Sequence, residues 1–84
     1  MEKIKDLTEE LNGDKATLYK LDRSIIFGEY ESRYVVVSTS SRYGLETYAF
    51  ISDDNGNFKT SKELHESQKG RVDHDEMARR VEQK

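Results

Sequence analysis

The sequence contains no cysteine, no proline and no tryptophan. Without cysteine the chain has no disulfide framework, no thiolate chemistry and no cysteine-based zinc site. It also has no apolar run long enough to cross a membrane, and its first residues, MEKIKDLTEEL, lack the apolar middle of a signal peptide. We therefore expect a soluble, cytoplasmic protein.

Large apolar residues are scarce. Leu, Ile, Val and Phe make up 18 of the 84 residues, close to the fraction below which chains stop folding. Their distribution favours folding, because half of the positions from Ala16 to Ile51 are apolar, whereas residues 52–71 contain only Phe58 and Leu64. This pattern predicts a single small domain over residues 1–84.

No block of like charge is present. The chain has 14 basic and 17 acidic side chains, and the formal net charge is −3. The two signs are mixed along the sequence, which excludes a basic nucleic-acid-binding arm and a DNA-mimicking acidic face.

The N-terminal segment has helical spacing. Ile4, Leu7 and Leu11 form one apolar stripe, and Asn12-Gly13 is a suitable helix end. A short helix over residues 2–11 is predicted, although the same Asn-Gly pair also suits a turn between strands.

The middle of the chain has strand patterns. Segments 16–21 and 24–30, joined by Asp-Arg-Ser, are predicted to be two strands, with Gly28 marking a bend or bulge. Three consecutive valines make 33–39 a central strand that is buried on both faces. In the next strand, 45–52, Tyr48 and Phe50 share one face. Residues 57–60 are expected to pair back as an edge strand.

The C-terminal segment predicts a helix over about residues 74–82. Asp73 can cap it, Glu76 can complete a capping box, and Val72 can pack against Met77. The fold expected is α+β: an antiparallel β-meander of three to five strands with a short helix at the N-terminus and another at the C-terminus.

The segment Asp-Asp-Asn-Gly-Asn, residues 53–57, suggests a calcium loop but fails as one. Counting from Asp53, the sixth position is Phe58 where such loops have Gly, and the twelfth is Leu64 where they have Glu. We interpret it as a turn in which Asn55 and Gly56 adopt positive φ.

The chemical motifs of enzymes are also missing. Asp-His-Asp-Glu, residues 73–76, lacks a second group of metal ligands and is explained by helix capping. No Ser lies in a nucleophile elbow, and the five Gly residues do not form a phosphate loop. We predict no metal, no cofactor and no catalytic residue.

Tyrosine is in excess, and several arginines lie near the tyrosines in sequence. These residues favour a protein-binding surface around the central strand, and an exposed edge strand leaves homodimer formation open. Stacking of single-stranded nucleic acid on the same rings is an alternative, made less favourable by the acidic net charge. Ordinary half-buried strand tyrosines are the simplest explanation. The partner-binding residues predicted are Tyr30, Arg33, Tyr34, Arg42 and Tyr43.

Several short motifs occur in a recognisable order: YVVVST, GLETYAFISDDNGN, Glu63-Leu64, Ser67 with Gly70, and DHDEMA over residues 73–78. They resemble a set of small uncharacterised bacteriophage proteins, over roughly residues 34–81. The chain departs from them at Ser61-Lys62, where they often have Trp, and at Arg79, where they tend to have an apolar residue.

The resemblance implies a phage or prophage origin and carries no catalytic residue across. The function expected is that of an accessory protein that binds a host or phage protein in the cytoplasm of the host cell, in host take-over or against a defence system. A structural or self-associating protein with no small-molecule site is the other alternative.

Overall fold

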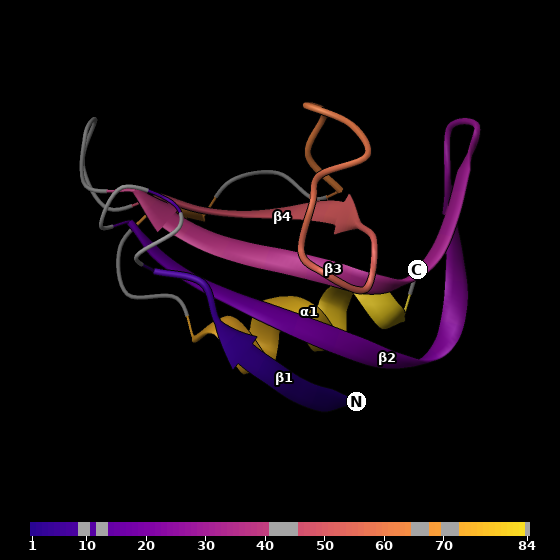
Figure 1. Cartoon of the computed structure of the whole chain (residues 1–84). Coiled ribbons are helices and arrows are strands. Elements are labelled where there is room, and N and C mark those ends of the chain that lie inside the picture. Colours follow the sequence, from indigo (N-terminus) through magenta and orange to yellow (C-terminus); the bar gives the residue numbers. More distant parts are fainter. Residues whose placement is uncertain (9–10, 12–13, 41–45, 65–67, 70–72, 84) are drawn as a thin grey trace.

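The computed structural model describes residues 1–8, 11, 14–40, 46–64, 68–69 and 73–83 (Figure 1). They form an antiparallel sheet in which every strand pairs with its neighbours in sequence, and one helix that packs on a face of the sheet. The elements are β1 (Glu2–Asp6), β2 (Lys15–Phe27), β3 (Tyr30–Ser40), β4 (Glu46–Ser52), β5 (Gln68–Lys69) and α1 (His74–Glu82). The predicted α+β class and antiparallel meander are confirmed.

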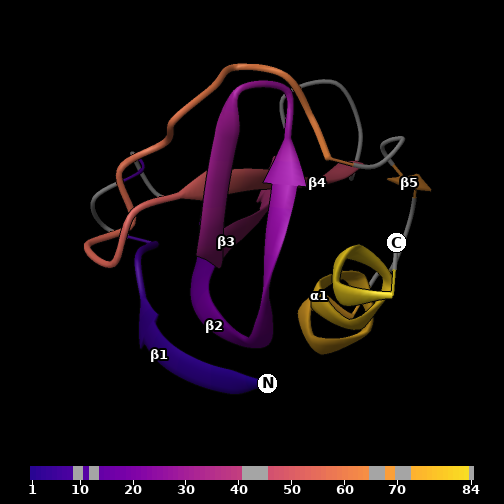
Figure 2. The same cartoon turned by 90° about the vertical axis from the view of Figure 1, so that its right-hand side faces the viewer.

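The middle strand β3 carries the core on both of its faces. Val35, Val36 and Val37 are all fully buried, as the run of valines predicted. Val35 and Val37 face α1, together with Tyr19, Ala49 and Ile51. Val36 faces the other side, in a smaller apolar cluster with Leu7, Ala16 and Leu18. In Figure 2, α1 lies to one side of the hairpin formed by β2 and β3.

The predicted N-terminal helix is wrong, because residues 2–6 form β1, which pairs antiparallel with β2. A helix this short is marginal in water, whereas the β2 edge offers hydrogen-bond partners to the backbone. The apolar spacing still has a role. Leu7 and Leu11, just beyond β1, both pack in the smaller cluster, and the Leu11 amide donates to the Leu7 carbonyl at 3.2 Å.

The two strands predicted at 16–21 and 24–30 are one bent strand, β2. Its pairing with β3 is irregular between Lys20 and Ile25, at the position where a connector was predicted. The chain reverses at Gly28-Glu29, inside the strand predicted at 24–30, so that Gly28 lies in a hairpin turn and Phe27 pairs with Tyr30. Gly28 has φ +63°, which suits the first central position of a tight hairpin turn. The distal half of this hairpin turns away from the sheet in Figure 1.

The outer edge of β4 is covered by the segment that follows it. Phe58 forms an isolated bridge with Ser52, the Lys59 amide donates to the Ile51 carbonyl, and the Leu64 amide donates to the Ala49 carbonyl. The edge strand expected at 57–60 is therefore reduced to a single bridge. β5, which has two residues, pairs with the start of β4.

The predicted C-terminal helix is confirmed as α1. The Asp73 side chain accepts a hydrogen bond from the Asp75 amide at 2.9 Å, which makes Asp73 the N-cap. Met77, Ala78 and Val81 are buried against the sheet. Glu76, expected in a capping box, lies beside Arg79 and Arg80. The predicted contact of Val72 with Met77 lies outside the described residues.

Candidate functional site

Three aromatic side chains form a stacked row on the face of β4 that points away from α1. The rings of Tyr48 and Phe50 have centroids 6.2 Å apart, and those of Phe50 and Phe58 have centroids 4.8 Å apart. Alternation along β4 places Tyr48 and Phe50 on one face, and the turn after β4 brings Phe58 back beside them. All three rings remain at least partly exposed, Phe58 by 43%.

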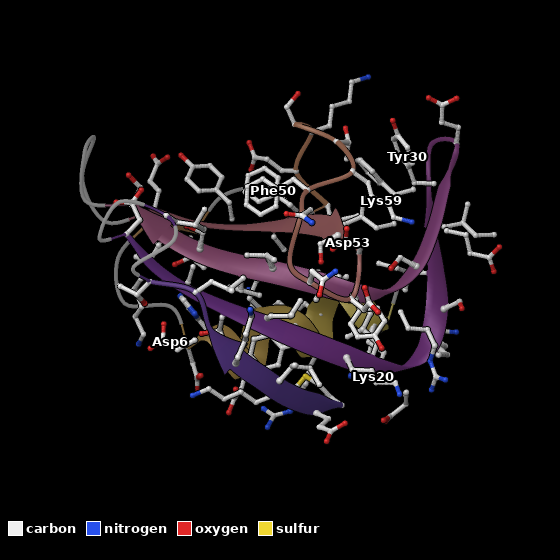
Figure 3. All side chains as sticks on the ribbon, in the orientation of Figure 1. Asp6, Lys20, Tyr30, Phe50, Asp53 and Lys59 are labelled. Carbon is white, nitrogen blue, oxygen red and sulfur yellow. The ribbon has the colours of Figure 1, made fainter. Side chains whose placement is uncertain are left out.

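The row continues toward the tip of the β2–β3 hairpin. Residues 58–62 run between β4 and this tip, and a surface cavity of about 220 Å³ is lined by Tyr30 of the hairpin together with Thr60 and Lys62. Figure 3 shows Phe50, Lys59 and Tyr30 along the same upper side of the molecule. We call Tyr48, Phe50 and Phe58 the aromatic surface, and Tyr30 lies at its border.

The charges beside the aromatic surface are of both signs. Lys59 and Lys62 border it, and neither ammonium group forms an ion pair with a described residue. Glu46 accepts a hydrogen bond from the Tyr48 hydroxyl, so its carboxylate is already used within the protein. The surface thus carries large rings bordered by two lysine side chains.

The predicted partner-binding residues are divided by the fold. Tyr30 packs against the core cluster on the α1 side, and Tyr34 packs against the smaller cluster on the opposite side. The Arg33 guanidinium donates to the Asp22 carbonyl at 2.8 Å, across the irregular part of the β2–β3 ladder. Arg42 and Tyr43 lie outside the described residues. Of the five, Tyr34 lies on the same face of the sheet as Phe50, and Tyr30 lines the cavity at the border of the aromatic surface.

Sequence reasoning missed Phe50 and Phe58 as surface residues. Tyr48 and Phe50 were correctly placed on one face of the strand, and this alternation was the available signal. For Phe58 the available signal was the expected pairing of residues 57–60 with the preceding strand, which the structure reduces to the bridge between Phe58 and Ser52.

The turn at residues 53–57 is organised by one carboxylate. Asp53 accepts hydrogen bonds from the Asn55 amide at 2.8 Å, the Asn57 amide at 3.0 Å and the Asn57 side-chain amide at 3.1 Å. These bonds hold the pKa of Asp53 below its usual value. Gly56 has φ +89°, as predicted for a turn. The carboxylate oxygens of Asp53 therefore accept hydrogen bonds from groups of the turn itself.

The Asp-His-Asp-Glu segment starts α1, and its histidine faces inward. His74 is 5% exposed, and both of its ring nitrogens contact threonine hydroxyls of the sheet. The neighbouring Asp75 accepts a hydrogen bond from the Tyr19 hydroxyl at 2.5 Å. Hydrogen bonds from His74 and Asp75 therefore connect the first turn of the helix to the sheet.

Within the described part of the chain, no group of three or more His, Cys, Asp or Glu side chains is arranged to hold a metal ion. Nor is any helix in that part long and apolar enough to cross a membrane. Comparison with family models, curated proteins and solved structures finds no match to this chain.

Proposed function

We propose that this protein acts by non-catalytic binding to another protein and that the aromatic surface is its contact site. The observation that carries the proposal is the stacked row of Tyr48, Phe50 and Phe58 on an otherwise polar, charge-rich chain. Aromatic side chains supply large apolar area with few rotatable bonds, and they are enriched at the centres of protein interfaces.

The arrangement of the rings favours a protein over a nucleic acid. Phe50 stacks against both Tyr48 and Phe58, so part of its ring surface is already in contact with other rings. Single-stranded bases bind proteins by stacking on free ring faces, whereas a protein side chain can pack against ring edges. The acidic net charge also opposes contact with phosphates.

The free cations define the partner's chemistry. Lys59 and Lys62 are exposed or half-exposed at the border of the rings and lack ionic partners among the described residues. A complementary surface would present aliphatic side chains to the rings and carboxylates to the lysines. The partner is therefore a folded protein with an apolar patch bordered by acidic residues.

The resemblance to small bacteriophage proteins supports placing this binding in an infected cell. A phage accessory protein that occupies a host protein needs a surface and no catalytic group. Host take-over and suppression of a defence system both meet that description.

The experiment compares substitutions of two residues of similar exposure at opposite edges of the sheet. Phe58 is 43% exposed beside β4, and Ile4 is 40% exposed in β1. The immobilised wild-type protein, Phe58→Lys and Ile4→Lys are each incubated with lysate of a bacterial host, and retained proteins are identified and quantified by mass spectrometry. Thermal unfolding of each variant establishes that it folds.

We expect one protein to be retained by both the wild type and Ile4→Lys. Its affinity for Phe58→Lys should be at least tenfold lower, which corresponds to about 1.4 kcal/mol of binding free energy. The purified partner should then bind more weakly to Lys59→Glu/Lys62→Glu than to the wild type. Equal retention by all three proteins would place the contact elsewhere. Binding of short single-stranded nucleic acids is measured separately by fluorescence anisotropy across a salt series. If these strands bind and no protein is retained, the stacking alternative is favoured.

A further inference from the structure

His74 joins the first turn of α1 to three adjacent strands. Its Nδ1 is 3.1 Å from the Thr17 hydroxyl in β2, and its Nε2 is 2.7 Å from the Thr39 hydroxyl in β3. The Thr39 hydroxyl is in turn 2.8 Å from the Thr47 hydroxyl in β4. The imidazole therefore lies within a row of buried or half-buried hydroxyls that crosses the sheet, between Thr17 on one side and Thr39 and Thr47 on the other.

Hydrogen bonding alone does not oppose protonation of this ring. A hydroxyl can donate to a neutral nitrogen or accept from an N–H, so Thr17 and Thr39 can serve the neutral and the charged imidazole alike. What opposes protonation is the charge itself, because the residue is only 5% exposed and lies at the N-terminal, positive end of a helix.

The charged groups around the ring are of both signs. A cleft of about 440 Å³ beside the ring is lined by Lys3 of β1, Lys15 of β2, the capping Asp73, and Asp75 of α1. β3 and β4 contribute only hydroxyls to the ring's hydrogen-bonded row, and the phenol of Tyr19 in β2 is bonded to Asp75. Burial, followed by Lys15, lowers the pKa of His74, while Asp73 and Asp75 act in the opposite direction.

We propose that α1 is an acid-operated latch: protonation of His74 releases the helix from the sheet and exposes the apolar face beneath it. The released segment would lose its structure, since a helix of nine residues is not stable alone. Its departure would uncover Val35, Val37 and Ile51, which now contact Met77, Ala78 and Val81.

The direction of the pH effect follows from linkage. The pKa of the folded His74 lies below the ordinary value of 6.5 that the released residue regains. At pH above 6.5 neither state binds the proton, and the latch is fully stable. As the pH falls below 6.5 the released state is protonated first, so docking weakens until the pH passes the folded pKa. Each unit between the two pKa values increases the release equilibrium about tenfold.

The far end of α1 is held by contacts that do not involve His74. Arg23 Nε donates to the Glu82 carbonyl at 3.0 Å, and the Asp22 amide donates to the Glu82 carboxylate at 3.0 Å. Release is therefore expected to begin at the first turn, around His74 and Met77. This order distinguishes the latch from global unfolding, in which all amides lose protection together.

The experiment measures amide hydrogen exchange and the His74 ring signal by NMR from about pH 7.5 to about pH 5, the range in which histidine changes charge. In the wild type, protection in α1 should fall with acid before protection in β2, β3 and β4. In His74→Gln, protection in α1 should not change over that range. Invariant protection in the wild type, or the same acid loss in His74→Gln, would overturn the proposal.

A second pair of variants leaves the histidine in place, so the proposal stays testable if His74→Gln fails to fold. Lys15→Gln removes a cation that faces His74, whereas Lys20→Gln removes the same charge from the opposite face of β2. The first should raise the His74 pKa and reduce the acid loss of α1 protection, and the second should change neither. Equal behaviour of the two variants would contradict the latch.

Discussion

Gly56 lies directly against the end of the Leu7 side chain, so a side chain at position 56 would require Leu7 to move. A Cβ at position 56 would stand 2.7 Å from Leu7 Cδ1. Gly56 also has φ +89°, a conformation that residues with a side chain rarely adopt. The turn after β4 therefore covers the small apolar cluster at the end of β1, and it does so because position 56 is glycine.

Gly56→Ala is expected to lower the free energy of unfolding by about 2–4 kcal/mol, which combines the backbone strain with overpacking against Leu7. Gly28→Ala is the matched control: Gly28 has φ +63°, but a Cβ at position 28 would meet no atom of the described residues within 4 Å beyond its chain neighbours. Gly28→Ala should lower the free energy of unfolding only by the backbone strain, about 1 kcal/mol. Urea unfolding followed by circular dichroism measures both, and equal losses would contradict the close contact with Leu7.

A double variant separates the two contributions at Gly56. Leu7→Ala removes the atoms that would clash and leaves a cavity of its own. The combination of Leu7→Ala with Gly56→Ala should therefore cost less than the sum of the two single changes. Strict additivity would show that strain alone accounts for Gly56→Ala.

The strands of the core could be predicted because the order of apolar and polar side chains along them indicates which faces are buried. The run Val35-Val36-Val37 requires two buried faces, and the alternation of Tyr48 and Phe50 assigns each side chain of β4 to a face. β1 could not be predicted in this way. All of its residues are exposed, so its strand structure comes from pairing with β2 and not from its own apolar pattern.

The aromatic surface was less predictable than the fold, because it depends on where the chain turns. The reversal lies at Gly28-Glu29, before the predicted position between strands 24–30 and 33–39, and it places Tyr30 beside the hairpin tip on the other side of the sheet from Tyr34. Phe58 reaches Phe50 through the turn that Asp53 organises. Neither relationship follows from residue spacing within one strand.

Tyr19→Phe is expected to lower the free energy of unfolding by about 1–2 kcal/mol, because the buried hydroxyl donates to Asp75 at 2.5 Å. Tyr30→Phe, at a partly exposed position, should be close to neutral. Thermal unfolding of the two variants at neutral pH provides the comparison. A neutral Tyr19→Phe would mean that water replaces the bond to Asp75 without cost.

The same hydroxyl predicts a loss of stability in alkali. Burial and then Asp75 raise the pKa of Tyr19 above its ordinary value of 10.0. The folded state therefore holds this proton more tightly than the unfolded state, and its stabilising contribution is lost as the pH rises above 10.0. In a spectrophotometric titration Tyr19→Phe should remove an ionisation that the wild type shows above pH 10.0.

The exposed edge of β1 is protected against pairing with a second copy. The strand is short, its ladder is irregular between Lys3 and Lys5, and both lysines are exposed. Lys3→Val/Lys5→Val is expected to raise the mass found by size exclusion with light scattering, whereas Lys3→Arg/Lys5→Arg should leave it unchanged. If the valine variant has the same mass as the wild type, the lysines are not what prevents association.

Asp53→Asn is expected to lower the melting temperature at neutral pH, because the amide replaces a charged acceptor that receives hydrogen bonds from Asn55 and Asn57. The folded pKa of Asp53 lies below 3.8, so the stabilising contribution of the carboxylate is complete above that pH. It is lost as the pH falls through the folded value. The difference in melting temperature between Asp53→Asn and the wild type should therefore shrink in strong acid.

Asp54→Asn is the control for this effect, since Asp54 is exposed in the same turn and its carboxylate accepts no hydrogen bond from a described residue. Its melting temperature should equal that of the wild type both at neutral pH and in strong acid. An equal loss of stability in the two variants would mean that the turn responds to total charge. If only Asp53→Asn loses stability, and only at pH above 3.8, the loss is due to the hydrogen bonds of the turn that holds Phe58 beside Phe50.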